Sequence, residues 1–134
     1  MKNDVILNKI AIIERCIKRI YEEYNNTASN LEKNTQQESI ILNLQRACGA
    51  SVDLAMSVIA DRKQCLPKNS HEAFNILEDQ GIIPSSLSSK MKTLIEFGRS
   101  AAYEEQEVSP SDLERIIKNH LVDFMQFTKT ILLY

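Results

Sequence analysis

The chain has 134 residues, of which 43% are hydrophobic and 25% are charged, and its formal net charge at pH 7 is −2. This length fits one domain, spanning residues 1–134, that is large enough to bury a core but too small to form two domains. The slightly negative charge excludes a protein that attracts nucleic acid over its whole surface, so any contact with RNA has to use a local groove.

The cysteines argue against a metal site and against a disulfide framework. Cys16, Cys48 and Cys65 are odd in number and form no C-x-x-C pair.

A membrane-spanning helix needs a run of about 18 apolar residues, which the sequence lacks. The start, Met1-Lys2-Asn3-Asp4, has no hydrophobic region typical of a signal peptide. We therefore expect a cytoplasmic protein with reduced thiols, without a metal, a cofactor or a membrane contact.

The first two predicted helices carry long apolar stripes at helical spacing. Residues 25–30, Asn-Asn-Thr-Ala-Ser-Asn, interrupt the pattern between them. Thr35-Gln36-Gln37-Glu38 has the spacing of a capping box, so we expect the second helix to begin at Thr35. Leu42 and Leu54 lie off its main apolar face, and such surplus apolar surface predicts a homodimer. The stripe of the first helix consists of Ile6, Ile10, Ile13, Ile17, Ile20 and Tyr24.

A short third helix and a longer fourth helix follow in the predicted order. Ser70 is expected to cap the third helix, residues 71–80, and Gly81 to close it in a left-handed conformation. Ser85 or Ser86 is expected to open the fourth helix. Its predicted buried residues are Leu87, Met91, Leu94 and Ile95.

The last predicted helix has the clearest start signal of the chain. Ser109 can cap it, Pro110 suits its first turn, and Asp112 suits the positive end of its dipole. Its apolar spacing continues without interruption from Leu113 to Ile131. Because no strand-like alternation competes with these patterns, we predict an all-α fold: an up-down bundle of four main helices with one additional short helix.

Three blocks of the sequence together resemble the HepT-like toxins of the HEPN superfamily. The first is DVILNKI at residues 4–10, and the second is LNLQRAC at residues 42–48 followed by VDLA at residues 52–55. The third is LPKNSHEAF at residues 66–74, continuing to IIKNHLVDF at residues 116–124. The likeness covers nearly the whole chain.

The resemblance implies a HEPN-like helical homodimer that pairs with a nucleotidyltransferase (MNT) antitoxin. It also implies metal-independent cleavage of RNA in a cleft between the subunits, by the arginine and histidine of an R-x-x-x-x-H-x-Y motif. The antitoxin can adenylylate the motif tyrosine. Histidine suits the proton transfer that activates the 2′-hydroxyl of RNA, and arginine stabilises the charge that builds on the phosphate.

The stretch that resembles this motif, F-G-R-S-A-A-Y-E-E-Q at residues 97–106, has no histidine. An alignment without a gap puts Gly98 at the arginine position. The same alignment puts Tyr103 at the histidine position and Glu105 at the tyrosine position. Because losing a general base typically costs about 10²–10⁴-fold in rate, we expect RNA cleavage to be reduced or lost.

A second alignment, slipped by one residue, restores the arginine but not the histidine. Arg99 then matches the arginine, while Glu104 and Gln106 match the histidine and the tyrosine. We take Arg99 as a candidate phosphate ligand and Tyr103 as the candidate that replaces the histidine, although a phenol with an ordinary pKa of about 10 is a poor base at pH 7. The alternatives are a solvated Arg99 that pairs with Glu96 or Glu104, and a Tyr103 that only packs.

Other polar residues have weaker functional interpretations. Arg46 and Asp53 lie two turns apart on one predicted helix, and we take them, with Glu104, as candidates for the cleft or for partner binding. A structural polar pair or dimer contacts explain Arg46 and Asp53 without any chemistry, and we favour that interpretation. His71 is expected to be exposed, and His120 to be a satisfied, partly buried histidine without a catalytic role.

Two functional hypotheses follow from these observations. In the first, the protein is a HepT-like toxin whose RNA cleavage is reduced or lost. In the second, it is a non-catalytic helical partner that binds the nucleotidyltransferase antitoxin or a nucleotide.

Overall fold

The computed structural model describes residues 3–63, 66–102 and 108–134, and every regular element within these ranges is helical. The prediction of an all-α bundle with one short extra helix is confirmed. The elements are α1 (Asp4–Tyr24), the 3₁₀ helix η1 (Ala28–Glu32), α2 (Asn34–Asp61), α3 (Ser70–Asp79), α4 (Ser85–Ala102), α5 (Pro110–Asn119) and α6 (Leu121–Leu133).

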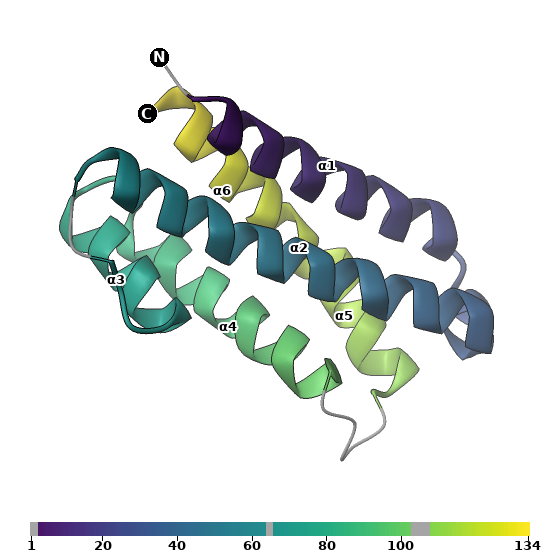
Figure 1. Cartoon of the computed structure of the whole chain (residues 1–134). Coiled ribbons are helices and arrows are strands. Elements are labelled where there is room, and N and C mark those ends of the chain that lie inside the picture. Colours follow the sequence, from purple (N-terminus) through teal and green to yellow (C-terminus); the bar gives the residue numbers. More distant parts are fainter. Residues whose placement is uncertain (1–2, 64–65, 103–107) are drawn as a thin grey trace.

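The helix α2 is the centre of the bundle (Figure 1). It contacts α1 along one side and α3 and α4 on the other, while α6 packs between α1 and α4. The start of α1 and the end of α6 lie at the same end of the bundle (Figure 1). Buried aliphatic side chains and three phenylalanines fill one continuous core. No helix in the described ranges is both long enough and apolar enough to cross a membrane.

The helix α1 follows its predicted stripe, and the two ends of the helix are set by asparagines. The side chain of Asn3 accepts a hydrogen bond from the Ile6 backbone N–H, which satisfies a donor that the first turn leaves unpaired. Asn25 ends the helix in a left-handed conformation with φ of 48°. Asparagine tolerates that conformation better than most residues, so the chain turns here. All six predicted stripe residues are buried.

The predicted caps of α2 and α3 are wrong by one or two residues. Lys33 is the cap residue of α2, without a side-chain hydrogen bond to the first turn, and Thr35 lies inside that turn. The Gln37 side chain instead donates to the Leu31 carbonyl oxygen at 3.1 Å, so η1 contributes to holding this end. At α3, the side chain of Asn69 rather than that of Ser70 accepts from a first-turn N–H.

Leu42 and Leu54 both lie off the main apolar stripe of α2, but they differ in exposure. Leu42 is 46% exposed, as expected, but Leu54 is fully buried. The prediction for Leu54 is wrong because α2 is covered from two sides, by α1 and by α3 and α4. A helix at the centre of a bundle buries more than one stripe.

The last predicted helix is divided at His120 into α5 and α6. The Asp123 backbone N–H donates to the His120 carbonyl oxygen at 3.0 Å, a three-residue spacing that interrupts the regular four-residue ladder. His120 Nδ1 also lies 3.3 Å from Asp123 Oδ2. Ile117, Leu121 and Phe124 stay buried across the break. The apolar spacing therefore conceals the break, and a single helix is the wrong prediction.

Candidate functional site

The C-terminal half of α4, where the motif-like stretch begins, has two faces of opposite character. Gly98 is buried and faces α2, where a Cβ atom at its position would lie 2.8 Å from Cys48 Sγ. Arg99 is 52% exposed. Because consecutive residues of an α-helix are turned by about 100°, one step along the sequence leads from the core to the surface.

The Gly98–Cys48 contact occupies the space that an arginine at position 98 would need. Real Cβ atoms essentially never approach other heavy atoms to 2.8 Å, so Cys48 Sγ would have to move. Cys48 is itself buried, and its thiol donates to the Leu94 carbonyl oxygen at 3.4 Å. The position that the gap-free alignment assigns to the motif arginine is therefore a packing position.

The buried thiols are unsuited to nucleophilic chemistry. Burial raises the pKa of Cys48 to about 12. Burial also raises the pKa of Cys16, against the opposing effects of Arg46 and Arg15. Because only a thiolate is an effective nucleophile or metal ligand, both thiols are inert near neutral pH.

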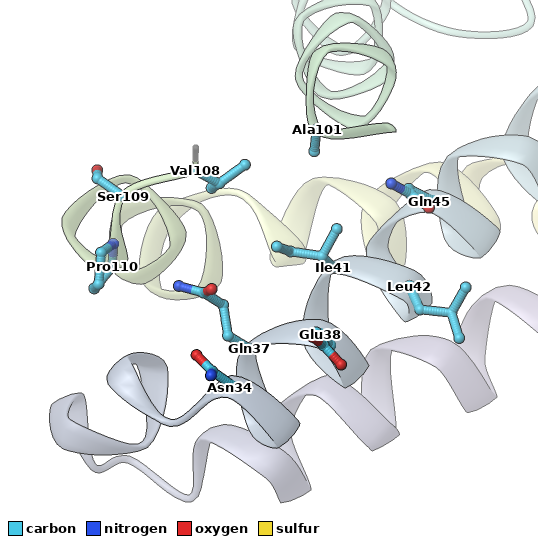
Figure 2. Close-up of a pocket in the computed structure, with 10 residues that line it drawn as sticks. All are labelled: Asn34, Gln37, Glu38, Ile41, Leu42, Gln45, Ala101, Val108, Ser109 and Pro110. Carbon is cyan, nitrogen blue, oxygen red and sulfur yellow. The ribbon is translucent and has the colours of Figure 1, made fainter. Parts of the chain in front are cut away.

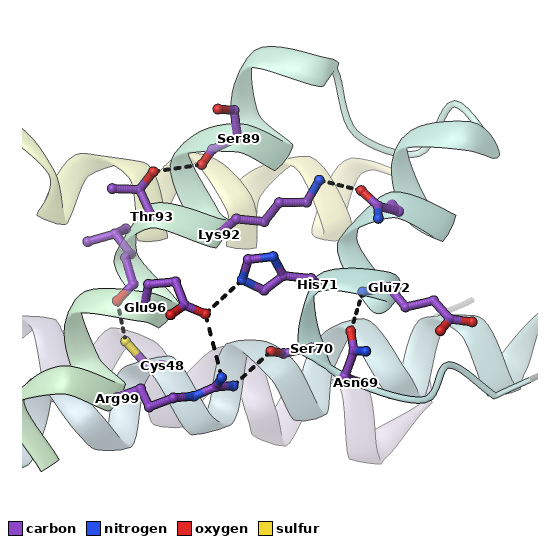
Figure 3. A network of polar contacts seen from close by, with 12 residues as sticks. Cys48, Asn69, Ser70, His71, Glu72, Ser89, Lys92, Thr93, Glu96 and Arg99 are labelled. Carbon is purple, nitrogen blue, oxygen red and sulfur yellow. Dashed lines mark hydrogen bonds and ion pairs between the residues drawn. The ribbon is translucent and has the colours of Figure 1, made fainter. Parts of the chain in front are cut away.

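On its outer side, α4 forms a polar network with the start of α3 (Figure 3). His71 Nε2 lies 2.8 Å from Glu96 Oε1. The same carboxylate oxygen lies 3.6 Å from Arg99 Nη1, and Arg99 Nη2 donates to Ser70 Oγ at 3.4 Å. The side chains of His71 and Glu96 are 45% and 49% exposed. A ligand in solution can therefore reach every member of this network.

Only some of the predicted site residues lie within the described ranges. Arg99 pairs with Glu96, one of the two partners expected for a solvated arginine. Tyr103, Glu104, Glu105 and Gln106 lie outside the described residues.

Asp53 and Arg46 do not form a pair with each other. Asp53 Oδ2 instead lies 3.2 Å from Lys9 Nζ of α1. Arg46 is exposed, and it has no ion pair with any residue in the described ranges. Asp53 also lines a pocket of about 500 Å³ beside Arg99 and Ser70, so it belongs to the same side of the molecule as the α4 residues.

A larger pocket, of about 820 Å³, lies further along the same side (Figure 2). The N-terminal half of α2 forms much of its lining, and Ala101 and the segment Val108–Pro110 close it. Gln45 lines both this pocket and the one beside Arg99. The two pockets therefore lie in a row along α2, on the uncovered side of the molecule that α2 and α4 form.

The two histidines have different surroundings. His120 is 32% exposed and held by Asp123 at the break between α5 and α6, in line with the expectation of a satisfied histidine. His71 is held by a carboxylate 25 residues away in sequence, which no motif predicts. No group of three or more histidine, cysteine, aspartate or glutamate side chains gathers into a metal site within the described part of the chain.

Comparisons with known proteins agree with this architecture. The family model described as Ribonuclease HepT-like matches residues 7–131. An mRNA nuclease HepT from Shewanella oneidensis is 36% identical over 129 residues, which is 96% of this chain and 97% of that relative. The solved structure of a tri-AMPylated Shewanella oneidensis HEPN toxin in complex with an MNT antitoxin superposes with a TM-score of 0.92 at 35% identity, over 99% of this chain and 100% of that one. A Bacillus subtilis cytosolic protein of unknown function, YutE, shares the fold with a TM-score of 0.82 at 16% identity, over 96% of this chain and 87% of that one.

Proposed function

Because the chain belongs to the family of HepT-like ribonucleases, we propose that it is the toxin-type partner of a nucleotidyltransferase antitoxin. We further propose that it cleaves RNA far more slowly than relatives with the complete motif. The toxin–antitoxin complex of its Shewanella oneidensis relative supports the first part. Its two described cysteines are free thiols, which suits the cytoplasm, where RNA and such a partner would be met.

The proposal that RNA cleavage is slow rests on the packing of Gly98 against Cys48. An arginine at position 98 would have to displace the thiol of Cys48, and residues 97–106 contain no histidine. In the gap-free alignment, the chain therefore lacks both the phosphate ligand and the general base of the family reaction. Arg99 is the one arginine of this segment, and it lines the pocket of about 500 Å³.

A homodimer suits the uncovered side formed by α2 and α4. Two pockets lie on this side, and Leu42, which is 46% exposed, lines the larger one. A second copy packed here would bury Leu42 and enclose the pockets, together with the exposed side chains of Arg46 and Asp53. Within this proposal Arg46, Asp53 and Glu104 contact the second copy or the antitoxin.

The same packing favours a second candidate, a partner without any catalytic activity. Such a protein would bind the nucleotidyltransferase, or its nucleotide, through the side that the family uses for cleavage. In either role Tyr103 is the tyrosine of the motif-like segment and the candidate to accept an adenylyl group.

Two measurements test the proposal and separate its candidates. The first is cleavage of total RNA and tRNA in EDTA, with the Shewanella oneidensis relative as positive control. We expect a rate at least about 100-fold below that of the relative, and an equal rate would contradict the proposal. Complete absence of cleavage would select the non-catalytic candidate.

The second measurement is co-purification with a nucleotidyltransferase encoded next to the gene of this chain, where we expect to find one. We expect a stable complex that elutes as one species. Failure of the two proteins to associate would contradict the partner role in both candidates.

A further inference from the structure

We propose that His71, Glu96 and Arg99 form a phosphodiester-cleaving site on the outer side of α4, in which His71 is the general base that the motif-like segment does not supply. The proposal rests on the RNA-directed role proposed above. It assigns the chemistry to a histidine that comes from α3 rather than from the motif.

The contact between His71 and Glu96 defines which nitrogen can act as a base. A carboxylate accepts hydrogen bonds and does not donate them, so His71 Nε2, at 2.8 Å, carries the hydrogen. In the neutral imidazole the lone pair is then on Nδ1. A carboxylate that holds one ring nitrogen fixes the tautomer and orientation of the ring, and it stabilises the imidazolium formed when the other nitrogen takes a proton. Glu96 is thus a positioning residue.

Arg99 lies on the other side of Glu96 from that nitrogen (Figure 3), and we assign it to bind a phosphate of the RNA. Its Nη1 lies 3.6 Å from the same Glu96 oxygen that holds His71, so the guanidinium and the imidazole are neighbours. A guanidinium has five N–H donors, and the contacts to Glu96 and Ser70 use only part of them. The remaining donors can reach the non-bridging oxygens of a phosphodiester.

The hollow next to the pair supplies a second cation. His71, Lys92 and two carboxylates, those of Glu78 and Glu96, line a pocket of about 410 Å³, and Lys92 also contacts Asn75. Lys92 and Arg99 lie on either side of Glu96 in the sequence of α4. Lys92 therefore adds one positive charge beside His71, against the negative charges of Glu78 and Glu96.

The reaction that these groups support is an internal transphosphorylation of RNA. His71 Nδ1 takes the proton of the 2′-hydroxyl, and the 2′-oxygen forms a bond to phosphorus. The bond between phosphorus and the 5′-oxygen breaks, and the leaving oxygen takes a proton from the imidazolium or from water. The products are a 2′,3′-cyclic phosphate and a 5′-hydroxyl, and neither metal nor redox partner is needed.

The exposure of the site predicts a slow reaction. In a single subunit the three side chains are 45% to 52% exposed, so water screens the charge of Arg99, which Glu96 also partly neutralises. This agrees with the weak cleavage proposed for the chain.

The test uses the full chain in EDTA and an oligodeoxynucleotide that contains a single ribonucleotide, with the all-deoxy strand as substrate control. We expect cleavage only at the ribonucleotide, with a 2′,3′-cyclic phosphate. His71→Ala and Arg99→Ala should each lower kcat/KM by at least about 100-fold. Glu96→Gln should lower kcat by about 10-fold at unchanged KM, because it keeps an acceptor for His71 but removes its charge.

Matched variants separate chemistry from general effects on the surface. Arg115→Ala removes an arginine that is also exposed and also paired three residues away on its helix, with Asp112. His120→Gln removes the other histidine. Both should cleave like the unmodified chain. Added imidazole should restore cleavage to His71→Ala but not to Arg99→Ala, an effect that a structural role for His71 would not produce.

Absence of the cyclic phosphate with the unmodified chain would overturn the proposal. It would also be overturned if His71→Ala kept full activity or gained nothing from imidazole. Co-purification of the same variants with the nucleotidyltransferase is an independent readout. If the complex forms while the site fails, the proposed partner role still stands, whereas a missing complex contradicts that role itself.

Discussion

Gly98 and Arg99 are neighbours in sequence, yet Gly98 is buried against Cys48 of α2 whereas Arg99 is 52% exposed beside Glu96 and His71. On the inner side of α4, the available volume decides which residue is allowed. On the outer side, charge and hydrogen bonding decide it, and several side chains meet without constraint from packing. The two sides should therefore respond differently to substitution: the inner side through stability, and the outer side through binding and chemistry.

The largest effect should come from placing the motif arginine on the inner side. Gly98→Arg brings bulk and charge into a position without space even for a Cβ atom. We expect it to lower the free energy of unfolding by about 3 kcal/mol, measured by urea denaturation. In a Cys48→Ala background the loss should shrink by at least about 1 kcal/mol, because the obstructing sulfur is gone. Equal losses in both backgrounds would show that Cys48 is not the obstacle.

The ionisation of Cys48 should make the inner side sensitive to alkaline pH. Burial raises the folded-state pKa of Cys48 to about 12, from an ordinary value of 9.0. Above pH 9 the unfolded chain loses this proton while the folded chain keeps it, so stability falls as pH rises, by about 1 kcal/mol per pH unit. Cys16 and Tyr24, whose pKa values burial also raises, act in the same direction.

The measurement is the free energy of unfolding of the unmodified chain and of Cys48→Ala at pH 8, 9 and 10. The advantage of the unmodified chain over the variant should decrease between pH 9 and 10. A constant difference would mean that the thiol ionises as easily in the folded state as in the unfolded one.

Two glycines offer a smaller test, in which the sign of the effect is decisive. Gly49, on α2, is exposed with nothing near its missing Cβ, so Gly49→Ala should stabilise the protein by up to about 1 kcal/mol through helix propensity. Gly98→Ala gains the same propensity but meets Cys48, so its net effect should be destabilising by about 1 kcal/mol. Thermal unfolding of the two variants side by side checks this, and two shifts of the same sign would contradict the difference between the sites.

The smallest effect on stability should come from the outer side. Glu96→Ala removes the carboxylate that contacts both His71 and Arg99, yet all three side chains are about half exposed. We expect a change within about 0.5 kcal/mol in the same denaturation assay. A loss above about 2 kcal/mol would mean that this network holds α3 and α4 together, and the contrast between the two sides would fail.

The sequence predicts several local features of the fold, because each depends on neighbouring residues. The stripe of α1 is an example, and the left-handed Gly81, with φ of 71°, and the Ser109 cap of α5 are others. The burial of Leu54 and the break at His120 are missed for a different reason. The first depends on which helices surround α2, and the second on a local hydrogen-bond pattern beneath a continuous apolar stripe.

The candidate site shows the same limit more sharply. The segment 97–106 contains Arg99, but the histidine that contacts Glu96 comes from another helix, 25 residues before Glu96. The steric role of Cys48 at Gly98 likewise depends on how closely α2 and α4 approach each other at these two residues. Contacts between helices decide both points, and no spacing within one segment encodes them.

The side-by-side placement of α1 and α6 has a consequence for synthesis on the ribosome. The chain emerges from its N-terminus, so α1 and α2 can pair early, but the face of α1 that contacts α6 stays open until the last helix has emerged. The Tyr24 hydroxyl also waits for its hydrogen-bond acceptor, Glu114, 90 residues later. A chain whose translation stops before α6 would therefore expose that face of α1.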